Sequence, residues 1–566
     1  MRQSLLKLSF VVIAAVLFNL IGQYFYGRYD LTKEKRFTLT SATKKLLSDL
    51  DDVVYMKVYL EGEFPAGFKR LRNATQEMLD EFRSYSGSRI EYEFIDYTAN
   101  VDAEEREAVA KSLMEKGLAP TRLIENKEDY SEKIIFPGAL ATYKGRELPI
   151  VLLQEQLNKT PEEALTNSMA LLEFNLANAI QKLQRLQKPT VAFLDGHGEL
   201  PMDDVQDFAY SLTKYYALER FNLAEQLYIP QKYAAIVIAK PTHSFEEANK
   251  YKIDQYIMNG GRVLWLVENL DCNLDSLMSN SGSFIALNYG LNLEDQLFKY
   301  GARVNFDVVQ DMQCAQIPLA TGVDQFGNAK QMQLFPWNYY PVITNHNDKH
   351  PLSKNTDALL FQFAGSIDTI AGKESQVKKE ILLTSSVYSR RTEAPVKINV
   401  NQVRQKIDPA QFPDKNLPVA VALEGKFTSV FKNRLAYSTK QMTDTIEELK
   451  FKELSAPTKM VVISDGDFAR NDFDAKTGRA APLGYYKYTR ETFANKDFLM
   501  NTIEWLTDDY GIIAARNRDV KARLLDEQRV KTQKTNWQLL NILAPIGMVV
   551  MFGAGFSFWR KRKYAQ

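Results

Sequence analysis

The chain of 566 residues is long enough for about three or four domains of ordinary size. Its composition, with 45% apolar and 25% charged residues, is that of a globular protein and excludes disorder as the main state. The 71 basic and 70 acidic residues leave a net charge of +1, which excludes an overall electrostatic drive towards nucleic acid. The two cysteines, Cys272 and Cys314, are too few for a disulfide scaffold or a cysteine metal cluster, and they could be either a pair or two buried thiols.

The first element along the chain is an uncharged apolar run over residues 8–25. Its length of about 18 residues is near the lower limit for crossing a bilayer. Arg2 and Lys7 precede the run, no small-x-small cleavage pattern closes it, and its aromatic end favours the membrane interface. We therefore predict an uncleaved transmembrane anchor within residues 1–30, with a cleaved secretory signal as the alternative.

Residues 31–157 show a strand–helix–strand–helix pattern followed by closing strands. The β-branched and aromatic run at 53–60 predicts a buried strand, and the amphipathic spacing over 68–85 predicts a helix. A second strand at 90–95 and a charged helix at 102–116 follow. This order resembles a thioredoxin-like unit. Because the unit contains no cysteine, thiol–disulfide chemistry is excluded there, and its role must be binding or spacing.

A long helix is predicted to join this unit to the rest of the chain. The segment TPEE at residues 160–163 is a capping box with proline at the first helical position. Apolar residues recur at helical spacing from Leu165 to Leu183, and Pro189 ends the helix. Such a stripe is typical of a helix that faces a core.

From residue 190 the chain alternates buried strands with helices. Runs that are apolar on both faces, separated by helices, are typical of a parallel doubly wound sheet. We predict one α/β domain over residues 158–515, with an inserted β-containing subdomain at about 270–455. The expected strands are 190–194, 235–239, 262–267 and 459–464, and the expected helices are 203–216, 244–258 and 497–508.

The last segments predict a second membrane span. A charged helical stalk is expected over residues 516–536, and an apolar run with a tryptophan at each end follows at 537–559. The basic tail at 560–566 should stay in the cytoplasm, which places the N-terminus inside as well and the large body in the periplasm. Basic residues between Arg28 and Arg36 favour the opposite orientation, but the terminal cluster lies closer to its span. The predicted location is the inner (cytoplasmic) membrane, with two spans.

Polar residues follow each predicted strand of the α/β domain. Ligands of open α/β sheets bind outside the carboxyl ends of the strands, so we expect these side chains along one edge. Tight turns at Gly196 and Gly198, and helix caps, are the alternative explanation for all of them. The candidate ligand-binding residues are Asp195, His197 and Glu199 after the first strand, Lys240 after the second, Glu268 after the third, and Asp465 and Asp467 after the fourth.

The sequence offers no complete catalytic, metal or cofactor motif. His346 and His350 are four residues apart, but the residues around them predict a loop rather than a helix. Asp465 and Asp467 lack the later ligands of a calcium loop. There is no P-loop and no Gly-x-Ser-x-Gly elbow, and the Gly-His-Gly turn lacks the spacing of a dinucleotide site. We therefore predict that the protein is not an enzyme and uses no catalytic residue, cofactor or metal.

Six segments carry a family resemblance: VAFLDGHGEL, GGRVLWLVEN, YGARVNFDVVQDMQC, LFPWNYYPV, VALEGKFTSVFKNR and VVISDGDFARND. They resemble the GldG family, auxiliary subunits of an ABC transporter associated with gliding motility in Bacteroidota. The resemblance runs over nearly the whole chain and implies a non-ATPase membrane subunit beside a separate ATPase and a multi-span permease. It also implies that the central domain is similar in fold to a module of intraflagellar-transport proteins and to class I glutamine amidotransferases. The elbow cysteine of those enzymes is absent here, so their activity is not carried over.

Three functions remain open. The first is an accessory subunit that contacts ABC permease and ATPase subunits, the inner membrane and cell-envelope or motility proteins, but no nucleic acid. The pair of predicted spans favours it, because a receptor or an enzyme needs only one anchor. The second is a binding protein for a saccharide or peptidoglycan fragment, which would use the strand ends and the aromatic stretch at 337–340. The third is a hydrolase with paired carboxylates drawn from Asp195, Glu199 and Asp467.

Overall fold

The computed structural model divides the chain into two units, Met1–Asp519 and Val520–Gln566. The residues that it describes are 10, 13, 38–99, 102–124, 132–154, 159–274, 277, 282–322, 332–370, 376–404, 408–434, 450–474, 477–517 and 527–564. The predicted first span at residues 8–25 therefore lies outside the described residues, apart from Phe10 and Ile13.

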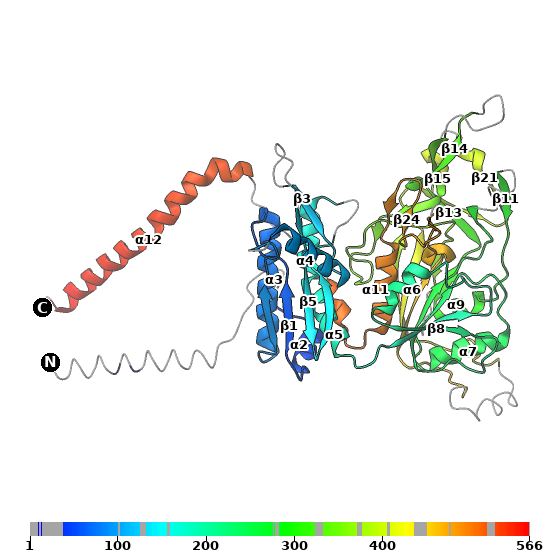
Figure 1. The fold of residues 1–566 in the computed structure, drawn as a ribbon, viewed down its shortest axis with the longest axis horizontal. Helices are drawn as coiled ribbons and strands as arrows, with labels where there is room; N and C mark the ends of the chain where they lie inside the picture. The colour runs from blue at the N-terminus through cyan, green and yellow to red at the C-terminus, as the bar shows by residue number, and fades with distance from the viewer. Residues whose placement is uncertain are drawn as a thin grey trace. The chain divides into compact units, whose positions relative to one another are not determined.

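The first sheet has four strands in the order β2-β1-β5-β6. Strands β1 and β2 are parallel, whereas β5 pairs antiparallel with both β1 and β6. Helix α3 lies along this sheet (Figure 1). The predicted order of strands and helices is confirmed, and the thioredoxin-like assignment stays a prediction. The elements are α2 (Ser41–Ser48), β1 (Val54–Val58), α3 (Ala66–Tyr85), β2 (Ile90–Phe94), α4 (Ala103–Glu115), the hairpin β3 (Thr121–Ile124)–β4 (Glu132–Ile135), β5 (Gly138–Tyr143) and β6 (Arg146–Val151).

Helix α5 (Pro161–Gln184) begins at the predicted capping box. The Glu163 amide donates to Thr160 Oγ1 over 3.3 Å, and the Thr160 amide donates to Glu163 Oε2 over 2.9 Å. The helix packs against α3 and β6 and also against the 3-10 helix η5 (Ile512–Asn517). It therefore connects the first sheet with the α/β domain, as its apolar stripe indicated.

The second sheet has eight strands in the order β16-β19-β22-β23-β10-β9-β7-β8. The strands from β23 to β8 are parallel, and β22, β19 and β16 extend the sheet with antiparallel pairing. The predicted parallel strands are therefore confirmed, and residues from 345 to 426, which were expected in the inserted subdomain, add antiparallel strands to the same sheet. Strand β8 was missed, since its half-exposed edge position leaves no buried apolar run. The strands are β7 (Thr190–Asp195), β8 (Ala217–Asn222), β9 (Tyr233–Ala239), β10 (Val263–Leu266), β16 (Asn345–His346), β19 (Gln376–Thr384), β22 (Pro418–Lys426) and β23 (Thr458–Ile463).

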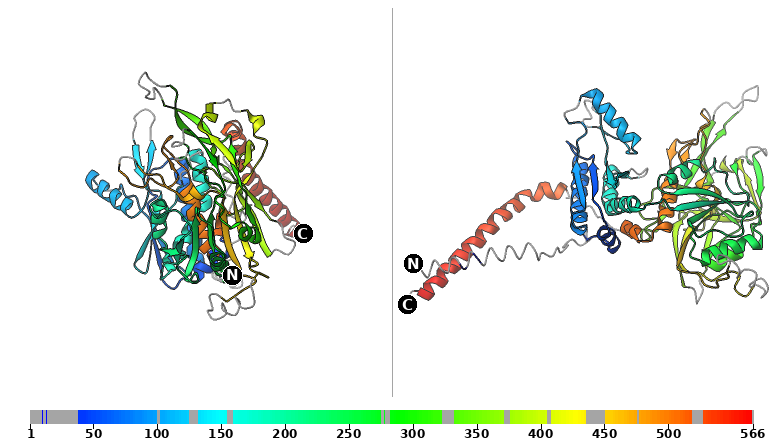
Figure 2. Two further views of the ribbon diagram at one scale, coloured as in Figure 1. Left: turned by 90° about the vertical axis from the view of Figure 1, so that its right-hand side faces the viewer. Right: turned by 60° about the horizontal axis from the view of Figure 1, so that its bottom comes forward.

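Helices cover both faces of the second sheet. Phe193 and Val461 belong to one apolar cluster with residues of α6 (Gln206–Thr213) and α11 (Asn495–Thr507). Their strand neighbours, such as Leu194 and Val462, belong to a second cluster with α7 (Glu247–Met258) and α9 (Glu294–Tyr300). Figure 2 shows green and orange segments of the chain interleaved in this domain, although they are far apart in sequence. Two buried faces are the arrangement that the continuous apolar strands predicted.

Short strands and 3-10 helices complete this unit. Trp337, Tyr339 and Cys272 are buried in a third apolar cluster there. Cys272 and Cys314 are free thiols, so the structure does not form the disulfide that was one of the two alternatives. The elements are β11 (Ser283–Ala286) with β21 (Val396–Asn399), β12 (Ala302–Val304) with β18 (Ile367–Thr369), β13 (Asp307–Asp311) with β20 (Ser389–Glu393), β14 (Cys314–Ala320) with β15 (Met332–Ile343) and β17 (Leu359–Leu360), β24 (Tyr485–Tyr486) with β25 (Glu491–Thr492), and the 3-10 helices η1 (Val400–Arg404), η2 (Pro409–Gln411) and η4 (Gly466–Ala469).

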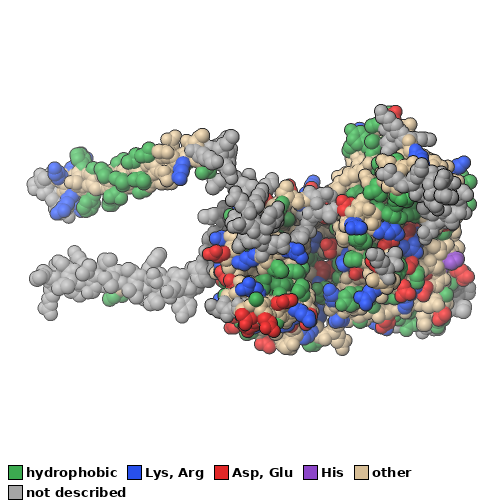
Figure 3. All heavy atoms as spheres, turned by 45° about the horizontal axis from the view of Figure 1, so that its top comes forward, with side chains coloured by type: hydrophobic (Ala, Val, Ile, Leu, Met, Phe, Trp, Pro, Cys, Tyr) green, Lys and Arg blue, Asp and Glu red, His purple; other side chains and the backbone are tan. Residues whose placement is uncertain are grey.

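The described part of the second unit is one helix, α12 (Glu527–Tyr564). Within it, Thr532–Lys563 is long and apolar enough to cross a membrane, and among the described residues it is the one helix with these properties. Figure 3 shows hydrophobic side chains along the helix and basic side chains at its end. The predicted stalk and second span are thus continuous over the described residues. Exposed apolar side chains at this density are typical of a surface that lipid or protein covers.

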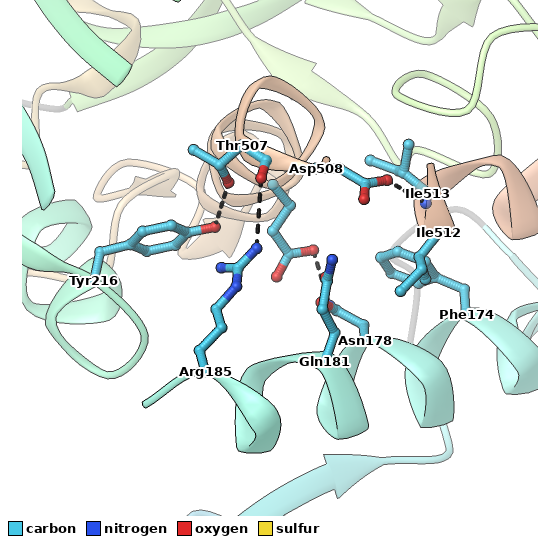
Figure 4. A pocket seen from close by; sticks show the side chains of 10 residues that line it. Phe174, Asn178, Gln181, Arg185, Tyr216, Thr507, Asp508, Ile512 and Ile513 are labelled. Carbon is cyan, nitrogen blue, oxygen red and sulfur yellow. Dashed lines mark hydrogen bonds between the residues drawn. The ribbon is translucent and has the colours of Figure 1, made fainter. Parts of the chain in front are cut away.

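A buried ion pair ties α5 to α11. Lys182 Nζ pairs with Glu504, and the two side chains are 10% and 12% exposed. Asn178 Nδ2 donates to Glu504 Oε2 over 3.1 Å, and Arg185 donates to the Thr507 carbonyl over 3.4 Å. Figure 4 shows Asn178, Arg185 and Thr507 at this junction. Burial opposes ionisation of Glu504, but Lys182 outweighs it and lowers the pKa of Glu504, so the pair is ionised.

We expect Glu504→Gln to lower the free energy of unfolding by about 3–5 kcal/mol, because the Lys182 ammonium stays buried without its counter-charge. Thermal unfolding of the full chain in detergent, followed by circular dichroism, measures the change. The control is Glu147→Gln, which removes an exposed ion pair with Lys116 and should change the stability by less than about 1 kcal/mol. Equal effects of the two substitutions would contradict a structural role for the junction.

Candidate functional site

Four of the predicted site residues meet at one edge of the second sheet. Strands β7, β9, β10 and β23 are parallel neighbours, so their carboxyl ends share this edge. Lys240, Glu268, Asp465 and Asp467 follow β9, β10 and β23, and they form what we call the strand-end cluster. Each of the four residues is at most 5% exposed. The predicted shared edge is therefore confirmed for these four side chains, and their role as ligand-binding residues stays a prediction.

Lys240 lies at the centre of the strand-end cluster. Its Nζ is 2.9 Å from Glu268 Oε1 and also pairs with Asp467 Oδ2. Its backbone adopts the left-handed conformation, with φ 51°, which is uncommon for a residue with a Cβ. Arg470 Nη1 is 2.8 Å from the other oxygen of Asp467, and Arg470 Nη2 is 2.8 Å from Asp204. Two cations thus connect carboxylates from several loops.

Backbone amides bind the remaining carboxylate oxygens of the cluster. Asp465 begins η4, where its Oδ1 accepts a hydrogen bond from the Asp467 amide over 2.8 Å. Asp465 Oδ2 accepts from the Gln362 amide over 2.7 Å. Glu268 Oε2 accepts from the Gly466 amide over 3.3 Å. Most carboxylate oxygens of the cluster therefore have a hydrogen-bond partner in the described protein, and Glu268 Oε1 has the ion pair with Lys240 in place of one.

Burial changes the protonation of the cluster. It raises the pKa of Glu268 to about 7, against the attraction of Lys240 and with the help of Asp467. Burial, together with Asp467 and Glu268, raises the pKa of Asp465 well above its usual range. Burial disfavours the charge of Lys240, but Glu268 and Asp467 outweigh it and raise the pKa of Lys240, which stays an ammonium. Burial therefore shifts Glu268 and Asp465 towards their protonated forms.

Glu268→Gln should change how stability depends on pH. The pKa of Glu268 is about 7 in the folded protein against an ordinary 4.5, so the folded state binds more protons between these values. Its contribution to stability is complete below about 4.5 and is lost as the pH rises through 7. Urea unfolding of the full chain across this range should show the wild type losing stability relative to Glu268→Gln.

The matched control is Glu424→Gln, at an exposed position of β22. Its difference from the wild type should stay constant across the same pH range. A Glu268→Gln difference that is equally constant would contradict the raised pKa of Glu268.

The acidic groups of the cluster could hold a cation by distance alone. One oxygen from each of Glu268, Asp465 and Asp467 lies within 4.8 Å of the others. The Lys240 ammonium already contacts two of these three carboxylates, and backbone amides bind oxygens of Glu268 and Asp465. A cation would have to displace that ammonium. The donor set fits a lysine-neutralised cluster better than a metal centre.

The other three predicted residues have partners of their own. Asp195 pairs with Arg220 of β8 over 3.1 Å. His197 Nδ1 lies 3.6 Å from Glu199 Oε1, and His197 Nε2 accepts from Asn249 over 3.1 Å. Glu199 Oε2 in turn accepts from the His197 amide over 2.7 Å. These contacts stabilise the turn after β7, which agrees with the alternative explanation that the sequence left open.

His346 and His350 face different carboxylates. His346 Nε2 lies 3.2 Å from Asp348, and His350 Nε2 lies 3.8 Å from Glu380. Burial lowers the pKa of His350 to about 4, so this imidazole is neutral at ordinary pH. Each histidine therefore contacts a carboxylate of its own, and the two do not share one.

Two site residues were not identified from the sequence. Arg470 lies three residues after Asp467, and the 3-10 helix η4 brings both to one ion pair. The spacing of three residues between Asp467 and Arg470 in the segment DGDFAR could have predicted this ion pair from the sequence. Asp204 binds Arg470 across 266 residues of sequence, and no local pattern predicts that pairing.

The fold and the site define a class of protein: a mixed α/β protein with internally paired charges at its strand ends and a helix able to cross a membrane. The family model described as an ABC-type uncharacterized transport system matches residues 188–502, which is more than half of the chain. The chain therefore belongs to this family. Membership links it to ABC transporter components in a non-ATPase, accessory role. A second model, a domain of unknown function (DUF7088), matches residues 33–142.

Similar proteins were also found by direct comparison. An uncharacterized protein of Borreliella burgdorferi is 22% identical over 449 residues, which cover 77% of this chain and 80% of that protein. A solved structure of the mmIFT52 N-terminal domain aligns at 13% identity and a TM-score of 0.29, over 56% of this chain and 98% of that one. A TM-score this low does not establish a shared fold.

Proposed function

We propose that the protein is a non-ATPase accessory subunit of an ABC transporter complex, anchored in the inner membrane by residues 8–25 and by α12. Its body faces the periplasm and acts through contacts with a permease, an ATPase-bearing complex and the cell envelope. The observation that carries the proposal is the family match over residues 188–502, in a chain that also has an apolar helix able to cross a membrane. The sequence contains no P-loop, so ATP hydrolysis must come from another chain.

The contacts of the residues at the strand ends support a role that involves no catalysed reaction. A hydrolase of the predicted kind would need two carboxylates facing one substrate. Asp195, Glu199 and Asp467 instead each contact a basic or imidazole group of their own: Arg220, His197 and Lys240. We therefore assign no reaction to the chain.

A role in gliding motility is the finer part of the proposal, and it rests on the resemblance to the GldG family. Three of the segments that carry the resemblance build the edge of the second sheet. VAFLDGHGEL contains β7 and its turn, GGRVLWLVEN contains β10 and Glu268, and VVISDGDFARND contains the end of β23 and η4. Half of the segments that carry the resemblance therefore belong to the framework around the strand-end cluster.

Purification tests the proposal directly. The full chain, tagged and extracted with mild detergent from its own bacterium, should co-purify with a multi-span permease and an ATPase, identified by mass spectrometry. A chain that ends at Asn517, and so lacks α12, should lose them, because α12 supplies the apolar contact surface in the membrane. Recovery of the full chain without any transporter subunit would refute the accessory role.

Cysteine labelling tests the orientation. Asn401→Cys places an exposed thiol in η1, and Ala565→Cys places one in the basic tail. A membrane-impermeant maleimide should label the first variant in cells with a permeable outer membrane, and the second only after the inner membrane is broken. The unmodified chain, with its thiols Cys272 and Cys314, gives the background. Labelling of Ala565→Cys before that of Asn401→Cys would reverse the proposed topology.

A further inference from the structure

A pocket of about 140 Å³ lies beside the strand-end cluster. Residues of η4, of β24 and its flanking positions, Tyr340 of β15 and Leu360 of β17 line it. Asp467 belongs both to the cluster and to the pocket wall, and the exposed Lys487 brings the pocket to the surface. Of the aromatic stretch at 337–340, Tyr340 lines the pocket, whereas Trp337 and Tyr339 belong to the apolar core. The pocket is therefore accessible although the cluster behind it is closed.

The wall of the pocket carries no net charge. Its charged lining residues are Asp467, Arg470, Asp472 and Lys487, two of each sign. The guanidinium group of Arg470 donates hydrogen bonds to Asp204 and Asp467 over 2.8–3.0 Å. Lys487 Nζ lies 3.3 Å from Asp472. A charged ligand would have to break one of these pairs, so the wall favours a neutral one.

Tyr340 offers a hydroxyl that the protein leaves unused. The residue is 3% exposed, and its Oη makes no hydrogen bond with any described residue. Tyr340 Oη is not one of the fully buried atoms that lack a partner, so it is reached from the pocket, where a sugar hydroxyl can replace water. Burial, with nearby Tyr486 and Asp467, raises the pKa of Tyr340 well above its usual value. The hydroxyl therefore stays neutral and can both donate and accept.

Tyrosine rings form the apolar part of the lining. Tyr486 is fixed because its hydroxyl donates to the Gln316 carbonyl over 2.6 Å. Its ring meets those of Tyr340 and Tyr488 edge to face, with centroids 6.5 and 5.3 Å apart. Polar side chains such as Gln362 and Asn471 stand beside these rings in the lining, and a saccharide likewise combines polar hydroxyls with an apolar C–H face.

We propose that this pocket binds one ring of a neutral saccharide. The pocket of about 140 Å³ opens to the surface beside the exposed Lys487, so a sugar ring can enter it while some of its hydroxyls stay in solvent. The C–H face of the sugar packs against the tyrosine rings, and one sugar hydroxyl bonds to Tyr340 Oη. The inference goes beyond the accessory role and does not depend on it.

The test is binding of sugars to the full chain, purified in lauryldimethylamine oxide because that detergent has no sugar head group. Saturation-transfer NMR with glucose, galactose, mannose and N-acetylglucosamine should give a saturable signal for at least one of them. Tyr340→Phe should weaken that affinity roughly five- to tenfold through loss of one hydrogen bond. Its unfolding temperature should not fall, because the hydroxyl has no partner in the described protein.

Two further variants separate the site from general effects. Tyr488→Ala removes one ring of the wall and should also weaken binding. Tyr210→Phe removes an exposed hydroxyl of α6, 67% exposed, and should leave the affinity unchanged. The proposal fails if none of the sugars binds, or if Tyr340→Phe binds like the wild type. It also fails if glutamate or trialanine, and not a sugar, shows the Tyr340-dependent signal.

Discussion

A buried ammonium group fixes the functional edge of the α/β domain. Lys240 contacts Glu268 and Asp467 at once, and these residues come from loops that are far apart in sequence. Breaking such a buried arrangement leaves an uncompensated charge, which is strongly unfavourable. The loops after β9, β10 and β23 are therefore held in one relative position. Because Asp467 also lines the pocket, the same ion pairs position that part of the pocket wall.

The same constraint limits what the edge can do. In open α/β sheets the carboxyl ends of the strands are where ligands bind. Here the protein fills that position with its own Lys240 and closes it with backbone amides, so a polar or charged substrate meets paired groups. The pocket beside the cluster has no net charge, and there the Tyr340 hydroxyl can form a hydrogen bond with a ligand. A binding and assembly role is the one that we propose for this arrangement.

Helix α5 connects the first sheet with the second sheet. The Lys182–Glu504 pair and the contacts around Thr507 join the helix to α11, while its other side packs against the first sheet. Because α11 also belongs to the apolar cluster under the second sheet, the two sheets share one continuous core. The buried ion pair gives the contact between α5 and α11 a defined register.

Local patterns in the sequence determined the elements whose signals lie within one segment. The capping box at Thr160, the apolar helix α12 and the buried parallel strands are of this kind, because hydrophobic period and capping residues act over a few positions. The residues that follow the strand ends, Lys240, Glu268, Asp465 and Asp467, were also identified from the sequence. Tertiary structure alone decided the antiparallel strands, the Arg470–Asp204 pair and the pocket at Tyr340. Those features depend on which distant segments become neighbours, and no single segment encodes its partner.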